Sequence, residues 1–219
     1  MGHTVLVNNS AEVINGLTAM LEESVNGDKK VLFLMPGGSA APIATKIWQN
    51  LSEASKANIT LSLTDERFGA VGHQDSNWKL LQELGVDVNE PRHIPVLGSL
   101  PDIQATAADW ATRLNSTVEA CDSVVALFGI GADNHIAGIK PSSPAVAEQN
   151  ELTSAYQGED FARITISPIF FENINKAAIY TEGPSKAEAV KSLENTRDYR
   201  VFPDELVKRC GSFVVYYKA

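Results

Sequence analysis

Residues 124–144, VVALFGIGADNHIAGIKPSSP, decide which fold the sequence predicts. They start with an uncharged apolar run, which is typical of a parallel strand covered on both faces. The run breaks at Gly129-Ile130-Gly131, and the next polar residues are Asp133, Asn134 and His135. Ligands of open α/β sheets bind just beyond the carboxyl ends of the strands. His135 alone among the four histidines directly follows such a strand, so it is the leading catalytic candidate.

Strand and helix patterns alternate along the rest of the chain. This alternation predicts one α/β domain over residues 1–219, a three-layer, Rossmann-like fold whose mostly parallel twisted sheet has helices on both faces. The other expected strands are Thr4–Val7, Val31–Met35, Ile59–Leu63, Arg163–Ser167, Ala177–Thr181 and Ser212–Tyr217. Ser10 is the expected N-cap of the first helix, and a second helix is expected after Ser39. Further helices are expected over about 76–84, 102–118, 183–193 and 203–210, with a loop over 90–101.

Composition limits the class of protein. The chain has 219 residues, of which 44% are hydrophobic and 21% charged, enough for a substantial core. A net charge of -9 argues against a nucleic-acid partner. No apolar run approaches the ~20 residues of a membrane span, and the start, MGHTVLVNNS, lacks the pattern of a secretion signal. We therefore expect a cytoplasmic protein that binds neither nucleic acid nor a membrane.

A second glycine-rich turn, Pro36-Gly37-Gly38-Ser39, lies between an expected strand and an expected helix. This arrangement binds phosphate, because a helix N-terminus presents unpaired N–H groups and a partial positive charge. The turn lacks the GK[ST] ending of an NTPase P-loop and the last glycine of GxSxG. Asn134 likewise replaces the third glycine of a dinucleotide GxGxxG motif. Ser39 is therefore a better ligand for an anion than a nucleophile. No histidine or cysteine spacing predicts a metal site.

Four stretches in one order resemble the 6-phosphogluconolactonases, whose wider family includes the glucosamine-6-phosphate deaminases. They are PGGSAAP, TDERFGAVGHQDSN, FGIGADNHIAGIKPSSPAV, and RITIS followed by GPSKAEAV, and they reach from about residue 30 to about residue 195. The resemblance implies a fold of the sugar-phosphate isomerase type. It also implies hydrolysis of 6-phospho-D-glucono-1,5-lactone to 6-phosphogluconate, a step of the oxidative pentose phosphate pathway, with no cofactor and no metal.

The resemblance also implies roles for individual residues. The family's DGH-type motif holds the general base, which falls on His135, and Asp133 would orient its imidazole. Histidine suits this role because its reference pKa of about 6.5 lies near working pH. The implied partner is a small phosphosugar substrate, and the residues implied to bind it are Gly37, Gly38, Ser39, Asp65, Arg67 and Lys186, with Arg163 as a further candidate.

Structural roles remain open for several of these residues. Asp133 can cap the turn that follows it, and Ser39 can be an N-cap. Asp65 and Glu66 can pair with Arg67 in a structural cluster, which would leave no arginine free for substrate. Asn134 stands where the family has glycine. If the backbone there needs a positive φ, asparagine is the least costly replacement.

The residues after His135 also depart from the family, which commonly reads TASLFPG where this chain has IAGIKPS. The added Lys140 faces either the anion site or solvent. Two other functions stay as alternatives. One is a glucosamine-6-phosphate deaminase or isomerase, but that group carries DEY and an early glutamate, where this chain has Arg67 and no acid between His135 and Glu148. The other is a non-catalytic sugar-phosphate-binding protein. The oligomeric state, monomer or homodimer, is open.

Overall fold

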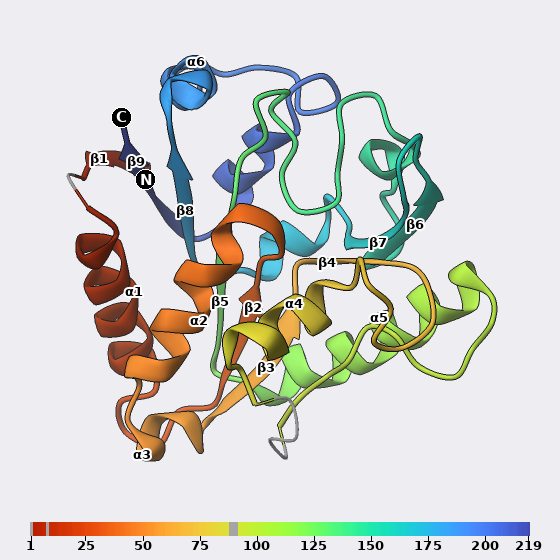
Figure 1. Cartoon of the computed structure of the whole chain (residues 1–219), viewed down its shortest axis with the longest axis horizontal. Helices are drawn as coiled ribbons and strands as arrows, with labels where there is room; N and C mark the ends of the chain where they lie inside the picture. Colours follow the sequence, from red (N-terminus) through yellow and green to blue (C-terminus); the bar gives the residue numbers. More distant parts are fainter. Residues whose placement is uncertain (1, 8, 88–91) are drawn as a thin grey trace.

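Six parallel strands form the central sheet of the computed structural model, which describes residues 2–7, 9–87 and 92–219. Their order across the sheet is β1-β9-β8-β5-β2-β3, and every neighbouring pair is parallel (Figure 1). The strands are β1 (Gly2–Leu6), β2 (Val31–Met35), β3 (Ile59–Leu63), β5 (Ser123–Phe128), β8 (Lys176–Glu182) and β9 (Ser212–Lys218). This confirms the predicted α/β sheet. Within the loop predicted at 90–101, residues 90 and 91 lie outside the described residues.

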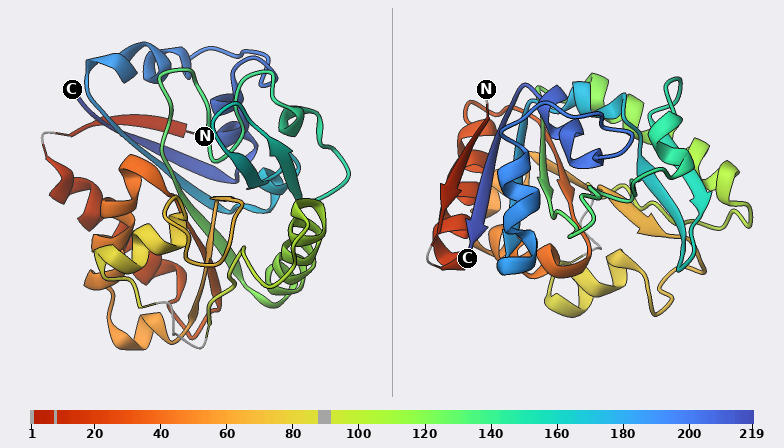
Figure 2. Two further views of the ribbon diagram at one scale, coloured as in Figure 1. Left: turned by 45° about the vertical axis from the view of Figure 1, so that its right-hand side comes forward. Right: turned by 90° about the horizontal axis from the view of Figure 1, so that it is seen from above.

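Helices cover both faces of this sheet. Helices α1 (Ser10–Ser24) and α2 (Ala41–Asn50) pack against each other on one face, and α5 (Ile103–Ala120) lies on the other (Figure 2). Every residue of β2 is buried, as its uncharged apolar sequence predicts. The shorter helices are α3 (Glu53–Lys56), α4 (Asn77–Leu84) and α6 (Ala187–Ser192), and the 3₁₀ helices are η1 (Gly38–Ala40), η2 (Pro144–Ala147), η3 (Phe170–Asn173), η4 (Pro184–Lys186) and η5 (Pro203–Arg209).

The helix starts differ in detail from the prediction. The N-cap of α1 is Asn9, whose side chain accepts a hydrogen bond from the Glu12 N–H at 3.2 Å, so Ser10 is the first helical residue. Asparagine and serine are both favoured at this position, and the sequence alone does not separate two adjacent candidates. The predicted helix over 203–210 is a 3₁₀ helix, η5.

A second, three-stranded sheet lies beside the first. It consists of β4 (Asp65–Arg67), β7 (Ala162–Ile166) and β6 (Thr153–Gln157), and both pairings are antiparallel. The chain passes from β3 directly into β4 at Thr64, whose carbonyl accepts a hydrogen bond from the Ile166 N–H at 3.0 Å. Strand β7 is close to the predicted strand Arg163–Ser167, whereas β4 and β6 were not predicted, because their polar residues show no apolar periodicity.

A hydrogen-bonded chain in the core joins α5 to the sheet. Trp110 of α5 is fully buried, and its Nε1–H donates to Ser62 Oγ of β3 at 3.1 Å. Ser62 Oγ in turn donates to the carbonyl of Ile94 at 2.9 Å. Three segments are thus fixed together beneath the edge of the sheet.

The topology also locates the functional end of the sheet. From β2 the chain continues outward to β3, whereas from β5 it continues in the opposite direction to β8 and β9. The neighbouring strands β2 and β5 therefore flank the switch point of the sheet, where ligands of open α/β folds bind beyond the carboxyl ends of the strands. The glycine turn at 36–39 follows β2, and the glycine turn at 129–131 follows β5.

Candidate active site

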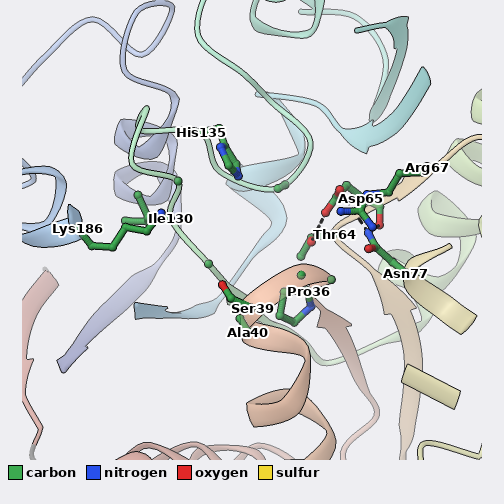
Figure 3. A pocket seen from close by; sticks show the side chains of 15 residues that line it. Pro36, Ser39, Ala40, Thr64, Asp65, Arg67, Asn77, Ile130, His135 and Lys186 are labelled. Atoms are coloured by element: carbon green, nitrogen blue, oxygen red, sulfur yellow. Dashed lines mark hydrogen bonds between the residues drawn. The ribbon is translucent and has the colours of Figure 1, made fainter. Parts of the chain in front are cut away.

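A cleft lies beyond the carboxyl ends of the four adjacent strands β8, β5, β2 and β3 (Figure 3). Its volume is about 560 Å³, including the part open to solvent. The predicted site residues that line it are Gly37, Gly38, Ser39, Asp65, Arg67, His135 and Lys186. Residues from four separate connections are thus brought together, as the switch-point position predicts.

The first glycine turn packs directly against Asn77 because Gly37 has no side chain. A Cβ at this position would lie 1.9 Å from Oδ1 of Asn77, which is almost completely buried. The turn continues as η1 into α2, whose N-terminus directs N–H groups and partial positive charge toward the cleft. The N-cap of α2 is Ala40, so the alternative of Ser39 as an N-cap is wrong. Ser39 is exposed and lines the cleft.

Glu66 fixes strand β4 against the start of helix α4. Its fully buried carboxylate accepts hydrogen bonds from the backbone N–H groups of Asn77 (2.7 Å) and Trp78 (3.1 Å) and from the hydroxyl of Ser76 (2.9 Å). These N–H groups belong to the first turn of α4, where a carboxylate is favourable. Burial raises the pKa of Glu66 despite these hydrogen bonds, which act to lower it. Glu66 is therefore a structural residue beneath the site.

Asp65 and Arg67, on either side of Glu66, face the cleft. The Asp65 carboxylate accepts a hydrogen bond from the hydroxyl of Thr64 at 3.0 Å. Arg67 donates to the carbonyl of Asp75 at 3.0 Å, and its guanidinium lies 5.3 Å from the ring centre of Phe161. Among the described residues no carboxylate forms an ion pair with Arg67, so the predicted alternative of a structural ion-pair cluster is wrong. Arg67 and the Asp65 carboxylate both line the cleft.

The structure does not bring Arg163 to the cleft. Its guanidinium, with a side chain only 9% exposed, forms two hydrogen bonds to the carboxylate of Asp160, at 2.6 and 2.7 Å. These bonds hold the pKa of Asp160 well below its usual range. Lys140 also contacts Asp160, at 3.2 Å, and does not line the cleft. Both cations thus contact the same carboxylate on the β6–β7 hairpin.

His135 and Asp133 form a hydrogen-bonded pair on the loop after β5. The distance from Nδ1 of His135 to Oδ1 of Asp133 is 2.6 Å, and the same oxygen accepts from the His135 backbone N–H at 3.3 Å. Partial burial acts to raise the pKa of Asp133, but the charge and hydrogen bonds of His135 outweigh it, and the pKa lies below its usual value. An ionised carboxylate only accepts hydrogen bonds, so Nδ1 carries the hydrogen.

The backbone around this pair explains two further residues. A Cβ at Gly131 would lie 2.0 Å from Nδ1 of His135, so the imidazole occupies the space that a side chain would need. Asn134 has φ +66°, which confirms the prediction that asparagine replaces glycine at a left-handed position. Asn77, which was not among the predicted site residues, also lines the cleft. Asn77 is the last residue of TDERFGAVGHQDSN, the second of the four stretches that resemble the family, so its DSN triplet was a sequence signal for this position.

The described residues contain no group of three or more histidine, cysteine, aspartate or glutamate side chains that could hold a metal ion. Within 2–7, 9–87 and 92–219, no helix has the length and apolar character needed to cross a bilayer.

The chain is similar to known proteins over most of its length. A model of the family described as glucosamine-6-phosphate isomerases/6-phosphogluconolactonase matches residues 7–215. The chain is also similar to a protein from Arabidopsis thaliana named probable 6-phosphogluconolactonase 1. The two are 24% identical over 209 residues, which cover 86% of this chain and 77% of that protein.

Solved structures share the fold. A 6-phosphogluconolactonase from Thermotoga maritima matches with a TM-score of 0.85 and 18% identity over 100% of both chains. A monomeric glucosamine-6-phosphate deaminase matches with a TM-score of 0.78 and 18% identity over 98% of this chain and 96% of that chain. At these identities the likeness shows a common fold, and the fold does not separate the two activities.

Proposed function

The chain belongs to the family of glucosamine-6-phosphate isomerases and 6-phosphogluconolactonases, and on that premise we propose that it hydrolyses 6-phospho-D-glucono-1,5-lactone to 6-phosphogluconate. The observation that carries the proposal is the His135–Asp133 pair at a cleft that also presents Arg67, Lys186 and a glycine turn. The pair supplies a base for water, and the cations and the turn supply a site for phosphate.

The proposed reaction needs only one base. Asp133 keeps the hydrogen on Nδ1 of His135, which leaves the lone pair of Nε2 to take a proton from water. The water oxygen then bonds to the lactone carbonyl carbon, and the carbonyl oxygen becomes an oxyanion that N–H groups of the glycine-rich turns stabilise. When the oxyanion collapses, the bond from that carbon to the ring oxygen breaks, and the imidazolium returns its proton to the ring oxygen.

The proposed phosphate ligands approach from different elements. In the view of Figure 3, Lys186 and Arg67 lie on opposite sides of the cleft, with His135 and Ser39 between them. A dianionic phosphosugar is held by such cations together with the N-terminus of α2. Of the residues that depart from the family after His135, Ile136 and Ile139 are fully buried and pair with each other through their backbones.

The test measures lactone hydrolysis by the wild-type protein and by His135→Ala in a rapid assay that corrects for spontaneous hydrolysis. We expect kcat to fall by about 10²-fold or more, because the general base is lost. KM should change little, since the phosphate ligands remain. Equal acceleration by both proteins would rule out this role for His135.

The same preparations should be assayed for ammonia release from glucosamine 6-phosphate. The deaminase alternative predicts rapid release, whereas the proposed lactonase activity predicts none. Ammonia release without lactone hydrolysis would replace the proposal by the deaminase activity. Tight phosphosugar binding with no turnover of either compound would instead indicate a non-catalytic binding protein.

A further inference from the structure

The loop that carries His135 is connected to a distant part of the chain by the residue immediately before it. Nδ2 of Asn134 donates to Oδ2 of Asp204 at 3.0 Å, and the backbone N–H of Asp204 donates to the Asn134 carbonyl, also at 3.0 Å. Asp204 is a fully buried residue of η5. Two hydrogen bonds therefore join the catalytic loop to a segment 70 residues away.

The Asp204 carboxylate is itself held in place. Both of its oxygens accept hydrogen bonds from Nη2 of Arg197 at 2.9 Å, and Nε of Arg197 lies 3.3 Å from Oε1 of Glu205. The guanidinium also stacks on the ring of Phe202, 4.4 Å from its centre. Buried charges are costly unless they are paired, and here each has a partner. The position of Asp204 is therefore defined by several contacts at once.

The hydrogen bonds that residues 131–135 form with one another are local. The Gly131 N–H donates to the His135 carbonyl at 3.0 Å, and the Asn134 N–H donates to the Gly131 carbonyl at 3.1 Å. These bonds shape the loop. Its connection to the second sheet begins three residues after His135, at Gly138, whose N–H donates to Thr165 Oγ1 at 3.0 Å and whose carbonyl accepts from the Tyr156 hydroxyl at 2.7 Å. A catalytic side chain must be held within about 0.5 Å of its productive position, which requires support from a rigid neighbour.

We propose that Asp204, fixed by Arg197, is a positioning residue that holds the His135 loop through the side chain of Asn134. The effect of this positioning on catalysis rests on the proposed lactone hydrolysis. Asparagine then serves two purposes at position 134: it tolerates the left-handed backbone, and its amide reaches Asp204. Glycine would satisfy only the first of these, because it has no side chain.

The variant Asn134→Gly separates these two purposes, since it keeps the backbone conformation and removes the amide. We expect kcat for the lactone to fall about tenfold, because a displaced imidazole acts less well on water, while KM changes less than about twofold. The matched control is Asp28→Gly, which places glycine at another left-handed residue (φ +61°), exposed and outside the cleft. The control should keep the wild-type kcat.

Asp204→Asn tests the other end of the connection. If Asn134 and Asp204 act through the hydrogen bond between their side chains, the double variant should lose no more activity than the less active of the two single variants. Additive losses would overturn the proposal, and so would a wild-type kcat for Asn134→Gly. The Asn134→Gly result decides the matter alone if Asp204→Asn does not fold.

Hydrogen–deuterium exchange over residues 129–140 gives a readout that does not depend on activity. We expect faster exchange in Asn134→Gly than in the wild type or in Asp28→Gly. Unchanged exchange would contradict the anchoring. If the wild-type protein hydrolyses no lactone, the proposed function fails, whereas faster exchange in the variant would still support the anchoring.

Discussion

Lys186 is the cleft residue whose role is most easily separated from folding. It lies at the end of η4, beside a helix that also carries the exposed Lys191, and only Lys186 lines the cleft. Two lysines in one short segment thus differ chiefly in their access to the proposed substrate.

We predict that Lys186→Met raises KM for the phosphorylated lactone by about 10- to 100-fold, because a hydrogen bond to a charged group contributes about 1.5–3 kcal/mol. Steady-state kinetics with competition by inorganic phosphate would measure this, and inhibition by phosphate should weaken in parallel. Lys191→Met is the matched control and should retain the wild-type KM. An equal rise in both variants would indicate a nonspecific effect of charge.

At the scale of elements, the site depends on the hydrogen bonds that connect β4 to the start of α4. The Glu66 carboxylate accepts these hydrogen bonds, and the flanking residues Asp65 and Arg67 reach the cleft as a result. A glutamine at position 66 would have the same size but only one accepting oxygen, so its NH₂ group would face donors.

Glu66→Gln should therefore lower the free energy of unfolding by about 1–3 kcal/mol. Because β4 loses its fixed position, KM for the lactone should also rise. Urea unfolding and steady-state kinetics measure the two effects. Glu83→Gln, on the solvent side of the same helix with a side chain 64% exposed, is the control and should change neither quantity. Unchanged stability of Glu66→Gln would show that the buried carboxylate is not needed.

The elements that sequence patterns predict well are those whose burial is nearly complete. The predicted bounds of Val31–Met35 and Ile59–Leu63 agree with β2 and β3. The first is an uninterrupted apolar run, typical of a strand covered on both faces, and the second alternates apolar residues with Thr60 and Ser62. Strand β4 has the polar sequence DER and exists because it pairs with β7, about 100 residues later. No local pattern encodes such a pairing.

The same distinction holds within the site. The meeting of the turns at 36–39 and 129–135 follows from glycines placed after parallel strands, which the sequence shows directly. The neutralisation of Arg163 by Asp160 depends on the geometry of a hairpin, and the contact of Asn134 with Asp204 depends on tertiary packing. Those partners could not be chosen from the sequence, because many acids and amides are equally available along it.

For the molecule as a whole, the net charge determines the electric field around the protein, whereas the buried core determines its stability. The net charge is -9, whereas the side chains of lysine, arginine and acidic residues that line the cleft are the two cations Arg67 and Lys186 and one carboxylate, Asp65. Local cations in a cleft therefore oppose the overall field. The organisation of residues 1–219 as one domain stays a prediction.

The buried contact of Trp110 with Ser62 permits a test of the core without touching the cleft. Trp110→Phe should lower the free energy of unfolding by about 1–3 kcal/mol, since it removes a hydrogen bond and leaves unfilled space. The values of kcat and KM measured well below the melting temperature should not change, because neither residue lines the cleft. A double-mutant cycle with Ser62→Ala should show coupling between the two sites. Strict additivity would contradict the importance of this hydrogen bond.

The dual use of Asn134 also limits how the chain can change by mutation. No single-base substitution converts an asparagine codon into a glycine codon, and the one-step intermediates encode aspartate or serine. Aspartate would place a second carboxylate against Asp204, and serine is shorter and tolerates a left-handed backbone less well. A lineage with asparagine at this position is therefore separated from the glycine form by less fit intermediates. Patterns that require glycine before the histidine will overlook such lineages, whereas a pattern based on backbone conformation will include them.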